Sequence, residues 1–437
     1  MADIADAILH LDISTPKRDR RLQVGWEGFF PYYAGFPETF VSRILVSAKL
    51  EPGATVLDPW NGSGTTTYAS AQLGFFAQGY DINPVMVIIA RARLLAASEA
   101  DALQPLAATI IGHLRVNLEA SEDDALCAWF TPATAAVIRG LEEEIRRTIV
   151  GALTVTQDGT VFGNIAGTAA TLYVALFSAC RNLAARFKSS NPTWLRRPKE
   201  GEEKVDASRS LVLQLFADNV RGMAAALAQK SLPGVRDLPR DWRVDVADTA
   251  NVKLPAESVD LVLTSPPYCT RIDYTAATRV ELAVLGPLLE ETVDDLGRRM
   301  IGTTQVPKVK VQPKGSWGPA CNALLEGVRA HPSKASGGYY YNTHLDYFDK
   351  MDRSLRSLGA GLKTGGAAIL VVQDSYYKEL HNDLPKIIGE MGELAGLELV
   401  RSERFAWRQS MSRINPHTKA YQRPSDATES VLCFAKP

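Results

Sequence analysis

The sequence predicts an α/β protein whose sheet of parallel strands is interrupted by a large helical insertion. Near the N-terminus, short apolar runs that end in turns alternate with helical segments, and the alternation resumes at Trp242. This pattern is typical of a parallel sheet with helices on its faces. Between the two regions strand signals vanish, and apolar residues recur at helical spacing, as in the run from Val137 to Ile145.

These patterns divide the 437 residues into three parts. Residues 1–99 form the first part of the α/β core, residues 100–238 form the helical insertion, and residues 239–437 form the second part of the core. Within the last part, an irregular basic loop rich in Lys, Pro and Gly is expected at 287–338. Two antiparallel strands with a long loop between them are expected to end the chain. A chain of this length accommodates two or three units.

The charge balance and the spacing of the cysteines limit the kinds of binding site that the sequence predicts. Lys and Arg number 48 against 49 Asp and Glu, which gives a formal net charge of -1. With this balance, a protein that binds nucleic acid must concentrate its positive charge locally. The five cysteines form no C-x-x-C pair, so we expect neither a metal site nor a disulfide framework. An acidic N-terminus and the lack of a long apolar run predict a cytoplasmic protein.

The first buried strand, from Thr55 to Trp60, leads into a glycine-rich turn, Gly62-Ser-Gly64, and then into a helix that starts at Thr65. Glycines at such a turn let the backbone pass close to a ligand, and ligands of open α/β sheets bind beyond the carboxyl ends of the strands. The turn lacks the third glycine of a dinucleotide fingerprint and the lysine of a P-loop. It is either the cradle of another ligand or a purely structural turn.

Two carboxylates end the next strands of the same predicted sheet. Asp81 follows the strand that begins at Phe76, and a carboxylate there can accept hydrogen bonds from both hydroxyls of a ribose. Asp248 follows the strand that begins at Arg243, where a polar side chain suits an adenine amino group. For each carboxylate the alternative role is that of a helix cap or a turn residue.

The segment Thr264-Ser-Pro-Pro-Tyr268 follows a fourth apolar strand, from Val259 to Leu263. Two consecutive prolines remove backbone donors and leave rigidly placed carbonyl groups. Together with the Ser265 hydroxyl, these carbonyls can accept hydrogen bonds from a substrate amino group and so orient its nitrogen. Tyr268 offers a flat face on which a planar base can stack. A Pro-Pro pair alone is common in turns, but this one lies at a strand end of the sheet that carries the glycine-rich turn.

Together these residues resemble the amino-methylating DNA methyltransferases, which act on N4 of cytosine or N6 of adenine. Asp58-Pro-Trp-Asn-Gly-Ser-Gly-Thr-Thr66 is similar to their cofactor motif, usually Asp-Pro-Phe-x-Gly-Ser-Gly-Thr-Thr, and Thr264-Ser-Pro-Pro-Tyr268 is similar to their catalytic motif. The segment from Phe29 to Phe36 resembles the aromatic segment that precedes the cofactor motif. The resemblance covers residues 25–95 and 240–375, and it implies a Rossmann-like class I methyltransferase sheet.

The resemblance also implies a cofactor, S-adenosyl-L-methionine, and roles for individual residues. The target base would leave the duplex, Tyr268 would stack on it, and Ser265 with the Pro266 carbonyl would bind its amino group. The base nitrogen would then attack the methyl group directly, without a covalent enzyme intermediate. The residues expected at the cofactor are Phe36, Asp58, Pro59, Gly62, Gly64, Thr65, Thr66, Asp81, Asn83 and Asp248, and those expected in catalysis are Ser265, Pro266, Pro267 and Tyr268.

The chain departs from the family pattern in three ways. Trp60 replaces the usual Phe, the helical block separates the second and third strands, and no known target-recognition domain is recognisable. The last departure leaves the target sequence, and even the polymer, open. Ser265 before Pro-Pro-Tyr favours N4 of cytosine, with N6 of adenine as the alternative. An RNA base methyltransferase and an inactive nucleic-acid-binding subunit are the further alternatives. Cys269 does not follow a proline, so we do not expect it to act as a C5-cytosine nucleophile.

Two basic segments with a neighbouring tryptophan are expected to hold double-stranded DNA. Such segments combine phosphate contacts with a surface for stacking, although each can also be a solvated loop. A restriction or phage-defence partner is possible for an enzyme of this family, whereas no membrane partner is expected. The residues of the first segment are Lys188, Trp194, Arg196, Arg197 and Lys199, and those of the second are Lys308, Lys310 and Lys314, which precede Trp317.

Overall fold

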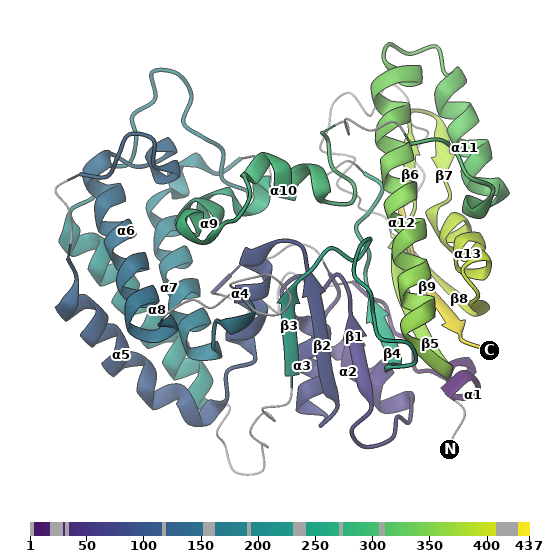
Figure 1. Cartoon of the computed structure of the whole chain (residues 1–437), viewed down its shortest axis with the longest axis horizontal. Coiled ribbons are helices and arrows are strands. Elements are labelled where there is room, and N and C mark those ends of the chain that lie inside the picture. The colour runs from purple at the N-terminus through teal and green to yellow at the C-terminus, as the bar shows by residue number, and fades with distance from the viewer. Residues whose placement is uncertain are drawn as a thin grey trace.

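The computed structural model describes residues 4–17, 29–30, 35–115, 119–151, 162–189, 194–229, 242–270, 274–305, 311–407 and 427–437. A seven-stranded sheet lies at its centre, in the order β3-β2-β1-β4-β5-β9-β8 (Figure 1). The first five strands pair in parallel, and β9 is antiparallel to both β5 and β8. The strands are β1 Thr55–Asp58, β2 Phe76–Asp81, β3 Trp242–Val246, β4 Val259–Thr264, β5 Leu362–Gln373, β8 Glu398–Trp407 and β9 Ala427–Ala435.

This strand order confirms the predicted Rossmann-like sheet and the antiparallel pair at the end of the chain. From β1 the chain first runs outward through β2 and β3, and it then returns to the other side of β1 as β4 and β5. The direction therefore reverses between β1 and β4. In open α/β sheets, the crevice at such a reversal, beyond the carboxyl ends of the strands, is where ligands bind.

Helices cover both faces of the sheet because side chains of buried strands alternate between the faces. Along β5, Ala367, Ile369 and Val371 pack in a cluster with α1 (Ile4–Leu9) and α2 (Glu38–Ser47). Ala368 and Leu370 pack in a different cluster, with α12 (Tyr341–Gly361) and α13 (Leu384–Leu394). The helix α3 (Thr65–Gln72) follows β1 and leads to β2.

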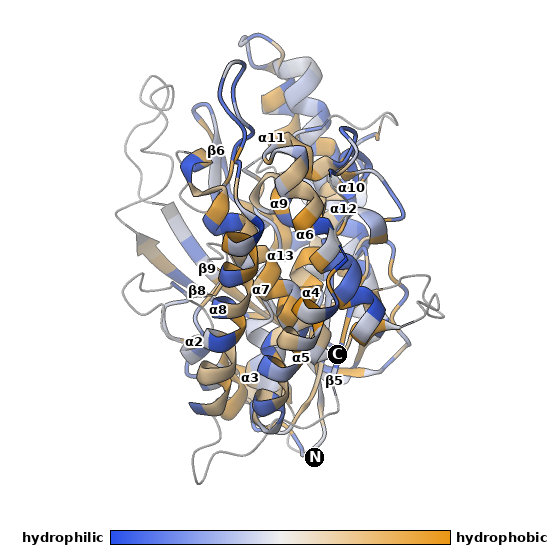
Figure 2. Cartoon of the chain, turned by 90° about the vertical axis from the view of Figure 1, so that its left-hand side faces the viewer, coloured by the Kyte–Doolittle hydropathy of each residue, from blue (hydrophilic) through white to orange (hydrophobic). Residues whose placement is uncertain are grey.

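The insertion extends the hydrophobic core around α4 (Pro84–Arg93), in which every residue is buried. Residues 100–228 carry four long helices and, within the described part, no strand of the sheet. Figure 2 views the molecule from this side and shows apolar residues along α4 and α7. The four helices are α5 Ala100–His113, α6 Pro132–Ile145, α7 Gly167–Leu183 and α8 Arg209–Ala228.

Among the described helices, α8 alone is long and apolar enough to cross a membrane, and 33% of that window is buried. One side of α8 packs into the insertion core through Val212, Phe216, Val220 and Met223. A core helix of a globular protein has the same length and composition, so this feature is weak evidence for a membrane span.

The segment 287–338, expected to be irregular, contains two helices, α10 (Val293–Arg299) and α11 (Gly318–Ala330). The Thr292 hydroxyl caps α10 by accepting from the backbone N–H of Asp295 at 3.1 Å. Pro319 stands in the first turn of α11, where its missing N–H has no cost. The prolines and glycines that indicated a loop therefore include residues that start a helix.

Candidate active site

The two predicted motifs meet where the sheet order reverses. The Thr264 hydroxyl at the end of β4 donates a hydrogen bond of 2.5 Å to the Asp58 carboxylate at the end of β1. The Thr66 hydroxyl in α3 donates to the backbone carbonyl of Leu263 at 3.1 Å. Asp58 is only 3% exposed, and burial raises the pKa of its carboxyl to about 6, against the lowering effect of its hydrogen bonds.

The glycine-rich turn is fixed by the carboxylate of the next strand. The backbone N–H of Gly62 donates to Asp81 Oδ2 at 2.9 Å, and the N–H of Asn83 donates to Oδ1 at 2.8 Å. Burial, with a smaller contribution from the charge of nearby Asp58, raises the pKa of Asp81 to about 6 against the lowering effect of its two backbone hydrogen bonds. Each carboxylate oxygen has a second lone pair, so Asp81 can accept further hydrogen bonds beside the turn.

Gly64 has two structural reasons to be glycine. Its φ angle is +78°, in the left-handed region that disfavours a side chain. A Cβ atom at this position would lie 2.8 Å from the Cβ atom of Ala90 in α4. The first neighbour that a side chain here would meet is therefore Ala90. Gly64 thus allows α3 and α4 to pack closely.

Asn61, which the sequence reasoning did not single out, adds a buried polar group at the same turn. Its side chain is 4% exposed, and Oδ1 accepts from the Thr67 hydroxyl at 3.1 Å. Its Nδ2 group has no hydrogen-bond partner within the described part of the chain. A buried amide N–H without a partner is costly, so this atom fits a ligand acceptor. The only signal in the sequence is its place inside the cofactor motif.

Asn83 and Asp248 hold local structure. Asn83 caps α4, because its Oδ1 accepts from the N–H of Val85, and its Nδ2 donates to Thr278 Oγ at 2.9 Å. Asp248 accepts from the N–H of Ala250 at 3.1 Å and from the Asn251 side chain at 2.6 Å. These contacts match the alternative roles of cap and turn residue.

Three more residues expected at the cofactor are engaged with the protein. Phe36 is 4% exposed and lies with its ring centroid 5.3 Å from that of Phe40 in α2. The Pro59 carbonyl accepts from the Thr249 hydroxyl. The Thr65 hydroxyl accepts from buried Arg93 at 3.2 Å. Of these contacts, the bond from Thr249 holds a backbone carbonyl of the first motif.

Hydrogen bonds attach Ser265 and Pro267 of the catalytic segment to two other elements, β5 and α12. The Ser265 hydroxyl donates to the carbonyl of Val371 in β5 at 3.1 Å. The Pro267 carbonyl accepts from the Tyr347 hydroxyl in α12 at 2.8 Å. The Pro266 carbonyl has no hydrogen-bond donor among the described residues. The segment therefore keeps one free acceptor between two groups that are held in place.

The Tyr268 hydroxyl reaches the last strand of the chain, where it donates to Glu429 Oε1 in β9 at 3.3 Å. Burial and the nearby Glu429 charge raise the pKa of the phenol well above its usual value, and burial raises the pKa of Glu429. Sequence reasoning missed Glu429 because 161 residues separate it from Tyr268. Cys269, next in the chain, is buried in the core cluster of α12 with Cys321.

The basic residues predicted to bind DNA differ in their exposure and in their ion pairs. Arg196 forms a bidentate pair with Glu202, at 2.6 and 2.9 Å, whereas Lys188, Arg197 and Lys199 are exposed. Trp194 is half-buried. In the second segment, Lys314 pairs with Asp349 at 2.6 Å and lies 5.8 Å from the ring centroid of Trp317. Lys308 and Lys310 lie outside the described residues.

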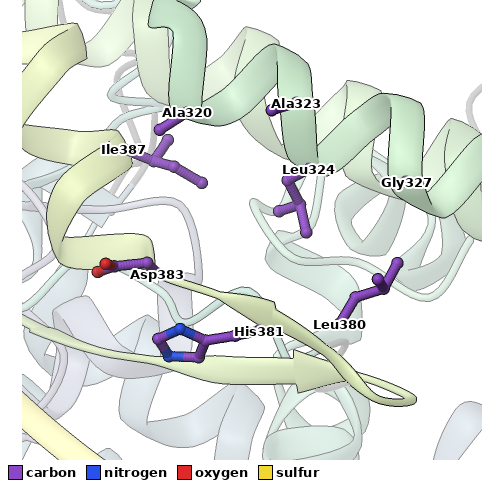
Figure 3. Close-up of a pocket in the computed structure, with 8 residues that line it drawn as sticks. All are labelled: Ala320, Ala323, Leu324, Gly327, Leu380, His381, Asp383 and Ile387. Carbon is purple, nitrogen blue, oxygen red and sulfur yellow. The ribbon is translucent and has the colours of Figure 1, made fainter.

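A surface pocket of about 270 Å³ lies between α11, α13 and the hairpin of β6 (Ser375–Tyr377) and β7 (Leu380–Asn382) (Figure 3). Its lining is mostly apolar, with His381 and Asp383 as the polar residues. None of the residues predicted from the sequence for the cofactor or catalysis lines it. The Asp383 carboxylate accepts from the N–H of Lys386 and so caps α13. The pocket is separate from the site at the strand ends.

Comparisons with known proteins agree with this geometry. Residues 10–91 match a family model described as DNA methylase, of the N6 and N4 methylases. The Type II methyltransferase M.BsoBI of Geobacillus stearothermophilus is 24% identical over 390 residues, which are 80% of this chain and 68% of that protein. Both findings support the assignment of the chain to the amino-methylating DNA methyltransferases. The fold and the matched family support an S-adenosyl-L-methionine-dependent methyltransferase.

Solved structures that align with the chain do so with low scores. A TehB-like SAM-dependent methyltransferase from Corynebacterium glutamicum is 10% identical, with a TM-score of 0.28, over 91% of this chain and 87% of that one. The rRNA methyltransferase aviRa from Streptomyces viridochromogenes is 14% identical, with a TM-score of 0.25, over 92% of this chain and 87% of that one. At these scores the likeness adds nothing to the strand order described above.

Proposed function

We propose that the protein transfers the methyl group of S-adenosyl-L-methionine to N4 of cytosine in DNA, at a specific target sequence. The hydrogen bond between Ser265 and Val371 carries the proposal. A hydroxyl has one proton and two lone pairs, and the Ser265 proton is donated to the Val371 carbonyl. Only acceptor capacity then remains for a substrate. Pro266 likewise offers a carbonyl and no N–H. Two neighbouring acceptors favour a substrate that presents an amino group.

The amino group of a paired base lies inside the duplex, so the target base is extruded before reaction. Tyr268 stacks on the extruded base, while Ser265 and the Pro266 carbonyl orient the two N–H groups and leave the nitrogen lone pair facing the methyl donor. S-adenosyl-L-methionine, held by the residues at the ends of β1 and β2, would supply the methyl group, which the amino nitrogen would take while the bonding electron pair stays on sulfur. The nitrogen then releases one proton to solvent. Positioning and exclusion of water supply the rate.

The residues at the ends of β1 and β2 suit the cofactor. S-adenosyl-L-methionine supplies an electrophilic methyl group when bound. Asp81 provides acceptors for ribose hydroxyls, and Asn61 provides a buried N–H group without a partner in the described residues. The left-handed backbone at Gly62, with φ of +48°, leaves the turn without a side chain on the ligand side. Asp58 and Thr264 connect this cradle to the catalytic segment.

Three other functions are compatible with the same fold. Ser265 before Pro-Pro-Tyr favours N4 of cytosine by resemblance, and N6 of adenine is the second candidate because its amino group has the same hydrogen-bonding pattern. An RNA base methyltransferase and an inactive nucleic-acid-binding subunit remain as rivals. The complete hydrogen-bond network from Asp58 to Tyr268 favours an active enzyme over the last of these.

We further propose that the insertion, residues 100–238, recognises the target sequence. Its helices α6 and α7 contact α9 (Arg279–Val284), which follows the catalytic segment. The exposed cations Lys188, Arg197 and Lys199 also belong to it. The similarity to a Type II methyltransferase supports a cytoplasmic enzyme that acts with a restriction or phage-defence partner.

Mass spectrometry of nucleosides tests the reaction. The purified protein is incubated with S-adenosyl-L-methionine and unmethylated plasmid DNA, and a parallel reaction contains RNA. We expect N4-methylcytosine in the DNA, loss of transfer in Tyr268→Ala and Ser265→Ala, and little change in Cys269→Ala. Detection of N6-methyladenine would make adenine the target base and leave the mechanism unchanged. A product of 5-methylcytosine that disappears in Cys269→Ala would contradict the mechanism.

A further inference from the structure

The catalytic segment, Thr264–Tyr268, extends across the end of the sheet, and its last residue contacts a carboxylate in β9. From β4 it passes over β5, where Ser265 is held, and it reaches β9 at Glu429. Glu429 is opposite Gln373 of β5 and Phe405 of β8 in the strand pairing, so its backbone is held from both sides. The position of its carboxylate is therefore set by the sheet and not by a loop.

The phenol hydroxyl is the only polar group on the Tyr268 ring. The backbone N–H of Tyr268 makes a long contact of 3.4 Å with the Tyr274 hydroxyl. The phenol donates to Glu429 at 3.3 Å and also interacts with the Ser265 hydroxyl. An aromatic ring without a polar contact can still turn about its side-chain bonds. A base stacks well only if the two planes are parallel and offset, so the orientation of the ring affects methyl transfer.

We propose that Glu429 is a positioning residue, which holds the ring of Tyr268 through its hydroxyl in the orientation that stacks the target base. The inference rests on the proposed function, because it requires that Tyr268 stack on a base. The bond is long for an O–H···O contact, and such bonds in free enzymes shorten when substrate binds. Burial raises the pKa of Glu429, while the charge of Lys17 and the hydrogen bond from Tyr268 oppose that rise.

A double-mutant cycle tests the proposal with single-turnover methylation of unmethylated plasmid DNA. Tyr268→Phe removes only the hydroxyl, and Glu429→Leu removes only the acceptor. Each variant should slow methyl transfer by about tenfold, which is the worth of one hydrogen bond to a charged group. The double variant should be no slower than Tyr268→Phe, since Glu429 acts on the ring only through the Tyr268 hydroxyl. Glu429→Gln keeps an acceptor oxygen and should recover most of the rate.

The controls separate positioning from stability and from a failed assignment of function. Glu403→Leu makes the same change on the neighbouring strand β8, where the carboxylate pairs with Arg401 at 2.8 Å, and should leave the rate unchanged. Cofactor affinity and the thermal midpoint are measured for every variant. Wild-type transfer by Tyr268→Phe, or additive losses in the double variant, would overturn the role of Glu429. Wild-type transfer by Tyr268→Ala would instead overturn the proposed function.

Discussion

The Thr264 hydroxyl lies 2.5 Å from Asp58 Oδ1 and joins the ends of β4 and β1, the two strands between which the sheet order reverses. The bond opposes the effect of burial on Asp58, since it lowers the pKa that burial raises. It also places the start of the catalytic segment against the cofactor motif. One contact thus serves the stability of a buried carboxylate and the relative position of the two motifs.

Replacing this hydroxyl should cost stability. Thr264→Val keeps the shape of the side chain but leaves Asp58 with less hydrogen bonding in a buried place, which costs about 1–3 kcal/mol. Thr264→Ser keeps the hydroxyl and should lose much less. Urea unfolding of the three proteins measures the difference. Equal midpoints for Thr264→Val and the wild type would show that the bond does not stabilise the fold.

Gly64→Ala should destabilise the fold before it affects the cofactor. The new methyl group would lie 2.8 Å from the Ala90 Cβ atom, and overpacking of this kind costs roughly 1–3 kcal/mol. Ala90→Gly removes that contact but leaves the strained φ angle at position 64. The double variant should therefore lose less than the sum of the two single losses. Strict additivity in denaturant unfolding would contradict the steric explanation.

The pH dependence of cofactor binding should follow Asp81. Burial raises the pKa of this carboxyl from 3.8 to about 6, so it is largely protonated at pH 5 and ionised at pH 7. The ionised form accepts hydrogen bonds from hydroxyl groups, and the affinity for S-adenosyl-L-methionine should rise with pH through about 6. Calorimetry at several pH values measures this rise. Asp81→Asn should flatten it, whereas Asp101→Asn, at an exposed position of α5, should not.

The raised pKa values of Asp58 and Asp81 should make the free energy of unfolding fall with pH, whereas cofactor affinity rises. Asp58 and Asp81 have folded-state pKa values of about 6, against 3.8 for an aspartate in water. Between these values the folded protein binds more protons than the unfolded chain, so the free energy of unfolding should fall as pH rises from about 4 to 6. Unfolding of the protein without cofactor at several pH values checks the sign. A rise in stability from these two groups over this window would contradict it.

The sequence predicted the parts of the fold whose residues are chemically distinctive. The strands β1 and β2 end at Asp58 and Asp81, and the Pro-Pro-Tyr segment follows β4, so the end of each strand is easily recognised. Parallel pairing then brings these ends to one edge. The antiparallel pair β8 and β9 was also predicted.

The contacts between distant segments could not be predicted. Nothing in the sequence indicates that Glu429 faces Tyr268, because the contact depends on the register of β9 against β5. The interactions of Lys314 with Asp349 and of Arg196 with Glu202 are likewise set by packing. Sequence reasoning counted both cations as available for phosphate, although the structure pairs each with a carboxylate.

Salt dependence should distinguish paired cations from exposed ones in the first basic segment. Each phosphate contact that is removed lowers the log–log salt slope of DNA binding by about 1. Lys188→Ala and Lys199→Ala remove exposed cations and should each reduce the slope. Arg196→Ala removes a cation that is already paired with Glu202 and should change it little. A larger change in Arg196→Ala than in the two lysine variants would refute this distinction.

The attachment of the insertion to the second half of the core should depend on a buried ion pair. Glu281 in α9 is fully buried, and its Oε1 accepts from Arg181 of α7 at 2.8 Å. Arg181→Met leaves the carboxylate buried without this cation, which should cost about 3–5 kcal/mol. Arg181→Met with Glu281→Met removes both charges and should recover most of the loss, since a well-packed apolar pair avoids the cost of burying ions. Guanidinium unfolding compares the three proteins. If the double variant is as unstable as Arg181→Met, two methionines do not restore the packing that the ion pair provides.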